Sequence, residues 1–231
     1  MVGDNYYRVS ALPALGDLGT PPPLTPATLR EHVADSRTAG ALIDVILLES
    51  DLLEREAFLA GEIREVEPSV LSPAQVRNEE PLPEFLAAEE EPGGPRVAAD
   101  AVWAAYFRHA AATAARLSSS LLSEWIAFEV ALRNALAAAR ARALELDPAG
   151  YLVTPDLGRS DMDVSPIVIE WSAAADPLAG LRVLDRARWT WLAEHEAWFS
   201  FTDDELAAYA VKLMLLVRWR RLSAEARRGH R

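Results

Sequence analysis

The sequence predicts an all-α protein, a multi-helix bundle of about seven helices that forms a single domain over residues 1–231. Three observations support this prediction. The stretch from residue 97 to 147 is rich in alanine and holds neither glycine nor proline, which favours helix. Apolar residues recur at helical spacing in several other segments. Helix cap motifs begin these segments, and no alternation of strands with helices predicts a nucleotide-binding sheet.

The first hundred residues predict an extended segment, two helices and a connector. Residues 6–10 are strand-like, so we expect them to be extended with their tyrosines buried. Thr25 followed by Pro26 is typical of a helix start, and a helix is expected over 26–34. A second helix is expected over 39–60, ended by Gly61. The connector, at about 62–96, holds six prolines and the acidic run 89–91.

The second half predicts four further helices. Serines at 118–120 compete for backbone hydrogen bonds, which favours a break between helices at about 98–117 and 121–146. The segment 148–175 is irregular, and its apolar run 167–169 could be a short helix or a strand. Asp176 and Pro177 begin the next helix, which is expected to run to about residue 196. After a turn at 199–201, Thr202 and Glu205 form a capping box for a last helix to about 222.

Composition and charge exclude several classes of protein. The net charge is −12, all of it contributed by residues 1–100, which carry 19 acidic residues and 7 arginines. Such a charge repels phosphate backbones, so no nucleic-acid partner is expected. The chain has no cysteine, no glycine-rich phosphate loop and no G-x-S-x-G motif, so we expect no enzyme and no cofactor. With no apolar run long enough to span a bilayer and no secretory signal, a cytoplasmic location is expected.

Two loops leave alternatives open. The acidic segment 79–91 is either a docking loop for a basic partner or a solvated connector. Three aspartates, Asp156, Asp161 and Asp163, could offer oxygen ligands to calcium, but their spacing matches no EF-hand loop. We therefore expect a polar loop and no metal site.

The helix expected over 121–146 carries one apolar face with polar residues beside it. Trp125 belongs to this face, and Glu129 precedes Arg133 by four residues, the favourable order for an ion pair. Asn134 adjoins them. Because all three polar groups lie beside the apolar face, they would be partly buried and would need hydrogen-bond or ion-pair partners. They form either a network that receives another subunit or an ion pair that fixes helix register.

The last two helices hold a second set of charged and aromatic residues. Asp185 and Arg188 lie near Trp189, where arginine can stack on tryptophan, and Arg188 is a reasonable partner for Glu129. On the final helix, Lys212 and Trp219 recur at helical spacing and so lie on the same face. Lys212 is the only lysine of the chain. We expect Lys212 to extend to solvent or to pair with a carboxylate, with a reactive lysine as the alternative.

Several of these segments resemble a bacterial family of uncharacterised proteins that is associated with V-type (A/V-type) ATPase operons. Residues 5–13, Asn-Tyr-Tyr-Arg-Val-Ser-Ala-Leu-Pro, are similar to the start of that family. Its central helix is similar to the segment that holds Trp125, Phe128, Glu129, Leu132, Arg133 and Asn134. Its C-terminal part is similar to the segments that hold Asp176, Pro177, Leu178, Leu184, Asp185, Arg188, Trp189, Tyr209, Lys212, Leu213, Arg218 and Trp219. The similar segments keep their order from residue 5 to about 222.

The resemblance implies a role and partners. The family is similar to a shortened form of the C/d component of the rotary ATPase central stalk, named C in prokaryotes and d in eukaryotes, which is an all-helical funnel without catalytic residues. The resemblance implies a non-catalytic structural or coupling component that docks on the rotor ring or central stalk. That position would be at the cytoplasmic face of the membrane, without insertion into the bilayer. The interface candidates are Trp125, Glu129, Arg133, Asn134, Asp185, Arg188, Trp189, Lys212 and Trp219. The alternative is a free-standing helical protein-binding module, a regulator or assembly factor.

Overall fold

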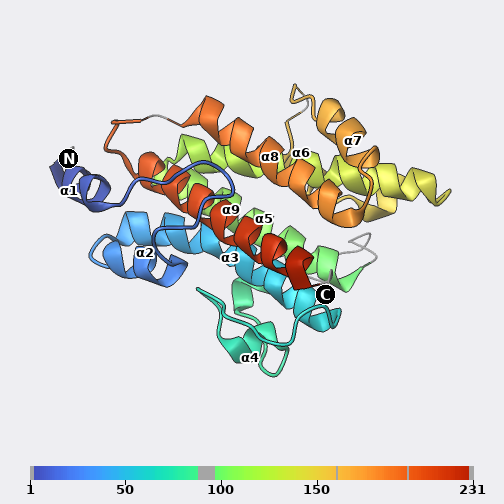
Figure 1. The fold of residues 1–231 in the computed structure, drawn as a ribbon, viewed down its shortest axis with the longest axis horizontal. Coiled ribbons are helices and arrows are strands. Elements are labelled where there is room, and N and C mark those ends of the chain that lie inside the picture. Colours follow the sequence, from blue (N-terminus) through green and yellow to red (C-terminus); the bar gives the residue numbers. More distant parts are fainter. Residues whose placement is uncertain (1–2, 88–96, 160, 197, 229–231) are drawn as a thin grey trace. The chain divides into compact units, whose positions relative to one another are not determined.

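The structure is a computed structural model that describes residues 3–87, 97–159, 161–196 and 198–228. Within these residues the chain is all-helical and contains no strand (Figure 1), which confirms the predicted all-α fold. The nine α-helices of the described part are α1 Gly3–Ala11, α2 Pro26–His32, α3 Arg37–Leu59, α4 Pro73–Val76, α5 Ala98–Leu117, α6 Ser120–Ala143, α7 Ser165–Ser172, α8 Pro177–His195 and α9 Asp203–Arg228. Three short 3-10 helices are η1 Glu84–Leu86, η2 Pro148–Tyr151 and η3 Pro155–Leu157.

The chain divides into two compact units. The first unit joins residues 1–50 to residues 170–231, and the second unit spans residues 51–169. Both borders fall inside helices, since α3 and α7 each begin in one unit and end in the other. That the whole chain acts as one domain stays a prediction.

In the first unit, α9 supplies the central apolar surface. Its residues from Leu206 to Leu216 are buried with few exceptions. The helix contacts α1, α2 and α8. Burial of so many aliphatic side chains is the main stabilising term for this unit, at roughly 25 cal/mol per Å² of apolar surface.

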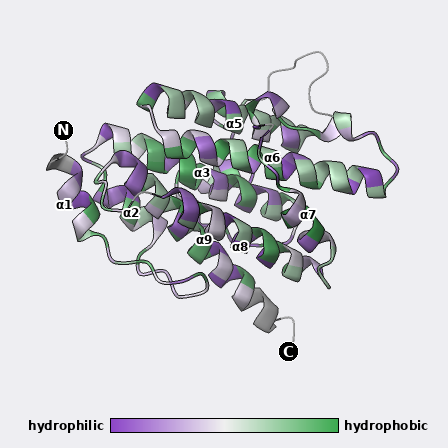
Figure 2. Cartoon of the chain, turned by 90° about the horizontal axis from the view of Figure 1, so that it is seen from above, coloured by the Kyte–Doolittle hydropathy of each residue, from purple (hydrophilic) through white to green (hydrophobic). Residues whose placement is uncertain are grey.

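In the second unit, α5 and α6 form an adjacent pair, and the 3-10 helices pack on them. Figure 2 shows the two helices side by side, each with hydrophobic and hydrophilic residues. A cluster of three aromatic rings, Trp103, Tyr106 and Phe107, fills the buried face of α5, with centroids 5.2–5.8 Å apart. The indole of Trp103 donates a hydrogen bond to Glu56 at 2.7 Å, which satisfies its buried N–H.

The predicted helix boundaries are confirmed where a local cap determines them. Ser118 adopts a left-handed conformation with φ 54°, and the Ser119 hydroxyl accepts from the backbone N–H of Leu122, so α5 ends and α6 begins at these serines. Thr25 and Asp176 cap α2 and α8 in the same way. The apolar run 167–169 belongs to helix α7.

Three sequence predictions are wrong in detail. Residues 6–10 lie in helix α1 and are not extended, and Tyr6 and Tyr7 are exposed. Tertiary contacts override their strand propensity, because Asn5 donates to Asp203 at 2.9 Å and the Arg8 guanidinium forms two hydrogen bonds with Asp35. The final helix extends to residue 228 instead of about 222. In place of the capping box with Thr202, the Glu205 carboxylate binds the backbone of the preceding turn.

The connector folds around a buried carboxylate of α3. Asp51 accepts three backbone N–H groups, from Ser69, Val70 and Leu71, at 2.7–2.8 Å. Burial raises the pKa of Asp51 above its ordinary value, against the opposing effect of these hydrogen bonds. The proline-rich segment is therefore attached to α3 in the part that is described. Of the predicted docking loop 79–91, residues 88–91, which include the acidic run 89–91, lie outside the described residues.

The hydrogen bonds between Asn134 and Val153 are expected to stabilise the second unit, and a substitution can test this. Its amide donates to the carbonyl of Val153 at 2.9 Å and accepts from the N–H of Val153 at 2.8 Å. Asn134→Ala leaves both backbone groups of a buried residue without these partners, so it should lower the free energy of unfolding by about 2–3 kcal/mol. Urea denaturation measures this, with Ser123→Ala on the exposed side of α6 as the control, expected within about 0.5 kcal/mol of wild type. An Asn134→Ala variant as stable as the control would contradict the assigned role.

Candidate functional site

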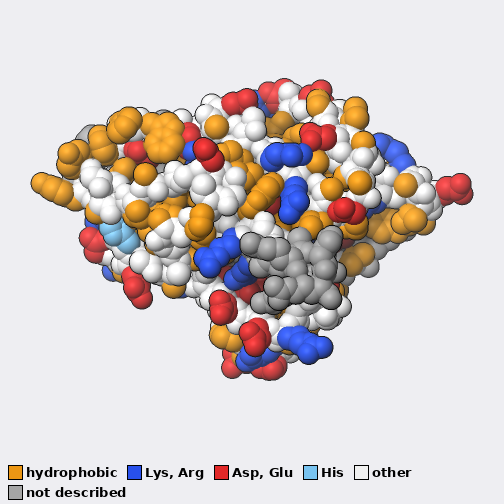
Figure 3. All heavy atoms as spheres, viewed as in Figure 1, with side chains coloured by type: hydrophobic (Ala, Val, Ile, Leu, Met, Phe, Trp, Pro, Cys, Tyr) orange, Lys and Arg blue, Asp and Glu red, His pale blue; other side chains and the backbone are white. Residues whose placement is uncertain are grey.

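Exposed aromatic side chains gather where α1 approaches the turn between α8 and α9. We call Tyr6, Tyr7, Trp198, Phe199 and Phe201 the aromatic surface. Tyr7 is 78% exposed, Trp198 57% and Phe199 80%, while Tyr6 contacts Phe201 with ring centroids 4.9 Å apart. Figure 3 shows hydrophobic side chains collected over this part of the first unit, with acidic side chains among them. A contiguous exposed apolar surface of this kind marks an interaction site more often than scattered exposed residues do.

The α8–α9 turn is held in a strained conformation by Glu205. Phe199 and Phe201 have φ of 59° and 51°, in the left-handed region that bulky residues rarely adopt. The Glu205 carboxylate accepts the backbone N–H of Phe199 at 3.0 Å and that of Phe201 at 2.7 Å. Glu205 therefore caps the strained turn, whereas the sequence predicted that it would pair with Thr202. The two charge-assisted hydrogen bonds offset part of the backbone strain.

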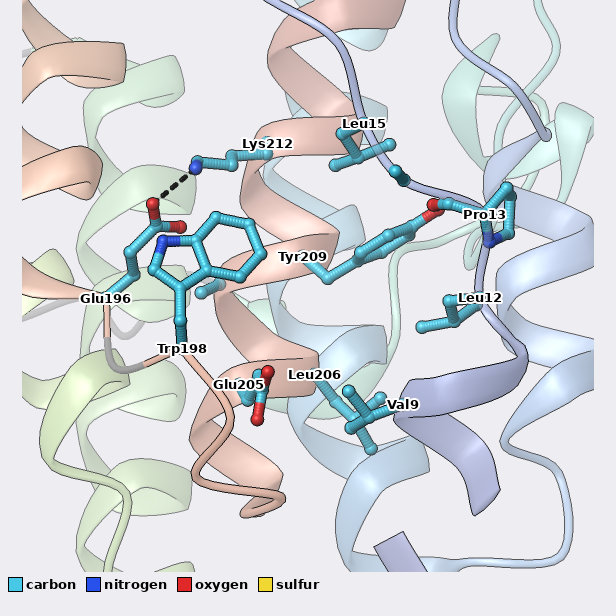
Figure 4. Close-up of a pocket in the computed structure, with 12 residues that line it drawn as sticks. Val9, Leu12, Pro13, Leu15, Glu196, Trp198, Glu205, Leu206, Tyr209 and Lys212 are labelled. Carbon is cyan, nitrogen blue, oxygen red and sulfur yellow. Dashed lines mark hydrogen bonds and ion pairs between the residues drawn. The ribbon is translucent and has the colours of Figure 1, made fainter. Parts of the chain in front are cut away.

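A groove lies beside the aromatic surface, between the segment that follows α1 and the start of α9. Its volume is about 130 Å³, and it is bordered mainly by apolar side chains with Glu196, Glu205 and Lys212 among them. In Figure 4 the Tyr209 hydroxyl points across the groove towards Pro13, and Trp198 covers the end at which Lys212 lies. Tyr209 donates to the Pro13 carbonyl at 2.9 Å, and burial raises the pKa of Tyr209 to about 12.

Lys212 lies at the inner end of this groove as a buried ion pair. The residue is only 7% exposed, and its Nζ lies 2.5 Å from Oε1 of Glu196 (Figure 4). The same ammonium lies 5.3 Å from the ring centroid of Trp189 and 4.6 Å from that of Trp198. A carboxylate and two indole faces thus surround the charge. Of the two alternatives that the sequence left open for Lys212, extension to solvent or pairing with a carboxylate, the structure shows the pairing.

Asp185 joins α8 to α9 through a second buried charge cluster. Its carboxylate is fully buried, and one oxygen lies 3.4 Å from Nη1 of Arg188 and 3.4 Å from Nε of Arg218. Trp219 lies close by on α9, with the Arg182 guanidinium 5.8 Å from its ring centroid. The sequence predicted arginine stacking at Trp189, but the structure places the Lys212 ammonium over that ring and the Arg182 guanidinium over Trp219.

The candidates on α6 are divided between core and surface. Trp125 and Glu129 are buried, and Trp125 packs against Phe128 at 5.8 Å between centroids. For Glu129 and Arg133 the sequence left a subunit-binding network or an ion pair open; the carboxylate that Arg133 binds is Asp100, at 3.1 Å, and its guanidinium lies 4.5 Å from the ring centroid of Trp103. These two groups on α5 offer a carboxylate and an indole face together. Glu129 and Arg188 belong to different units, and their pairing stays a prediction.

The three aspartates of the irregular segment are Asp156, Asp161 and Asp163, and the last two are used locally. Asp161 accepts two hydrogen bonds from Arg159, whose guanidinium lowers the pKa of this carboxyl. Asp163 accepts the backbone N–H of Ser165 at the start of α7, and hydrogen bonding to the side chain and then the backbone of Ser165 lowers the pKa of Asp163. Among the residues that the structure describes, no group of three or more histidine, aspartate or glutamate side chains could hold a metal ion.

The polar side chains of the site have partners within the protein. The ammonium of Lys212 is held against a carboxylate, Tyr209 donates to a backbone carbonyl, and Glu205 is occupied by two backbone N–H groups. The exposed part of the site is mainly aromatic, with the half-buried acidic residues 203–205 at the start of α9 beside it. Sequence reasoning selected Lys212 and Trp189 but missed Glu196, Trp198 and Phe199. The acidic pair at 194 and 196 beside tryptophans was the available signal for a lysine partner.

The Lys212–Glu196 pair can be measured by a double-mutant cycle. Removing either charge leaves the other in a site where both side chains are under 10% exposed, so Lys212→Met or Glu196→Gln should each cost about 3–5 kcal/mol of unfolding free energy. The double variant should cost clearly less than the sum, because no unpaired charge remains. Chemical denaturation of the four proteins supplies the cycle. If the free-energy changes of the two single variants added up to that of the double variant, the two groups would not interact.

Tyr209 predicts a stability change at alkaline pH. Its pKa is raised from 10.0 to about 12, so the phenol contributes stability that is complete below pH 10 and is lost as pH rises towards 12. Tyr209→Phe should cost about 1 kcal/mol near neutral pH through the lost hydrogen bond to Pro13. The difference from wild type should shrink between pH 10 and 12. Denaturation at a series of pH values tests this, and an unchanged difference across that window would contradict it; Tyr7→Phe is the matched control.

Comparisons with known proteins assign no family to this chain. No protein-family model, curated protein or solved structure matches it. No helix among the described residues combines the length and the apolar character that a bilayer crossing requires. The function is therefore inferred from the residues themselves and from the contacts that they make.

Proposed function

We propose that this protein is a non-catalytic structural or coupling component of a V/A-type rotary ATPase. It would dock on the cytoplasmic face of the rotor or central stalk, as a permanent member of the complex or as an accessory protein. The observation that carries this proposal is the ordered set of segments, from residue 5 to about 222, that resembles a family associated with V-type ATPase operons. A shortened relative of the C/d component of the central stalk would be all-helical, as the described residues are.

The contacts of the resembling residues support a structural role for them. Asn134 holds the backbone of Val153, and Asp185 holds two arginines. Lys212 is enclosed by Glu196 and two tryptophans. Side chains that are engaged in this way position helices, which supports a structural role for them. A coupling component needs a stable helical body of this kind and a surface for its partner.

A second candidate is a free-standing helical binding module, a regulator or assembly factor. The observation that favours it is the aromatic surface, which would serve a soluble partner as well as a membrane-bound machine. The two functions differ in the partner and in where the protein is found. A coupling component would be peripheral at the inner membrane through its complex, whereas a regulator would be recovered mainly with soluble proteins.

Affinity purification from the native host tests the proposal. The tagged protein, isolated from gently solubilised membranes, should recover rotor-ring and central-stalk proteins in a fixed ratio, as identified and quantified by mass spectrometry. The same tag on an unrelated acidic protein controls for charge-driven capture, and a wash at higher salt separates specific from screened contacts. Recovery of soluble proteins alone would overturn the ATPase proposal and favour the binding module.

A further inference from the structure

The aromatic surface and its groove have the dimensions of a site for one inserted side chain. The groove measures about 130 Å³ and is bordered by Val9, Leu12, Pro13 and Leu206. An apolar cavity of about 150 Å³ is large enough to hold a benzene molecule. A leucine or phenylalanine side chain from a partner would therefore fill the groove, which Trp198 joins to the aromatic surface, and the exposed rings of Tyr7 and Phe199 on that surface would offer further contact.

The turn and the start of α9 supply negative charge beside this surface. Residues 194–211 carry five acidic residues and no lysine or arginine. Lys212 pairs with Glu196. Asp203 accepts from the amide of Asn5, and Glu205 accepts backbone N–H groups, so these neutral donors leave both negative charges in place. A partner that buries its apolar side chain here would meet this charge best with lysine or arginine.

The backbone conformation of Phe199 costs stability, although its side chain is exposed to solvent. A phenylalanine at φ 59° costs free energy that glycine would not, and the side chain recovers little by burial because it is 80% exposed. With its ring turned to solvent, Phe199 adds little to the packing of the described fold. The affinity for a partner would benefit, because a ring already held outward by the backbone loses little conformational entropy on binding.

We propose that the groove and the aromatic surface bind a basic segment of a partner protein that inserts one large apolar side chain. The apolar side chain would enter between Leu12 and Leu206, and flanking lysines or arginines would face the acidic residues 203–205 at the start of α9. This assignment deepens the proposed function and rests on it for the identity of the partner as part of an ATPase. The chemistry of the surface itself is independent of that identity.

A synthetic peptide tests the chemistry directly. The probe is a fluorescein-labelled, lysine- and alanine-rich peptide of about 15 residues with one central leucine, long enough to form a marginal helix. One control peptide has serine at the centre, and another has glutamate in place of each lysine. We expect the leucine peptide to bind at least about tenfold more tightly than either control, by fluorescence anisotropy, with affinity that falls as salt rises. Equal binding of the leucine and serine peptides would overturn the proposal.

Variants of the protein assign the binding to this surface. Tyr7→Ser and Phe199→Gly, combined, should weaken binding of the leucine peptide at least about tenfold. Ile169→Ser, which removes another exposed large apolar side chain, 69% exposed, should change binding less than about twofold. Phe199→Gly alone should melt at least as high as wild type, because it relieves the left-handed strain. A double variant that binds like wild type would overturn the assignment, and the melting temperature shows that lost binding is not lost folding.

The same variants in the native host separate this inference from the proposed function. If wild type and Ile169→Ser recover rotor and stalk proteins while the Tyr7→Ser/Phe199→Gly variant does not, both are supported. If the double variant recovers these proteins as wild type does, the surface assignment fails and the ATPase proposal stands. If wild type recovers none of them while the peptide results hold, the ATPase proposal fails and the surface still binds a basic, apolar segment.

Discussion

The carboxylate of Asp185 is fully buried on α8 and faces two arginines, Arg188 on its own helix and Arg218 on α9. An unpaired carboxylate in that place would cost several kcal/mol, so α8 and α9 must pack in the register that brings these groups together. A second buried ion pair, between Lys212 on α9 and Glu196 at the end of α8, restricts the packing of the same two helices. Two buried charge contacts separated along α9 fix both the distance and the rotation of the helices. The aromatic surface is built on the turn that these contacts hold in place.

Local chemistry made much of the fold predictable. Helices α5 and α6 follow from alanine-rich sequence, and their boundary follows from serines that prefer caps to helix interiors. Helix α1 was not predictable in the same way, because tyrosine and valine favour strands and the helix depends on Asn5 and Arg8 reaching residues far along the chain. Arg133 shows the same limit. Its spacing from Glu129 fits an ion pair within the helix, but Asp100 and Trp103 offer it a carboxylate and an indole together.

The candidate site was predictable in its buried part and not in its exposed part. For the single lysine on an apolar helix face, the sequence left extension to solvent and pairing with a carboxylate open, and the cost of burying an unpaired charge favours the pairing. The outward position of Phe199 depends on a backbone conformation that its residue type disfavours, and no pattern of hydrophobic residues encodes a positive φ. The three-dimensional position of Glu205, which accepts both backbone N–H groups of the turn, accounts for it. Sites that depend on strain are for this reason the ones that sequence reasoning misses.

The residues that carry the family resemblance and the residues that carry the proposed contact differ in where they lie. Many of those in the central and C-terminal segments are buried, as Trp125, Glu129 and Asp185 are. Such residues specify a helical body and would be shared by any protein of that fold, whatever it binds. The opening segment is different, because Asn5 and Arg8 attach α1 to the first unit while Tyr6 and Tyr7 are exposed. Binding specificity would therefore reside in α1 and the acidic start of α9, where apolar rings and negative charge lie together on a surface that folding alone does not require.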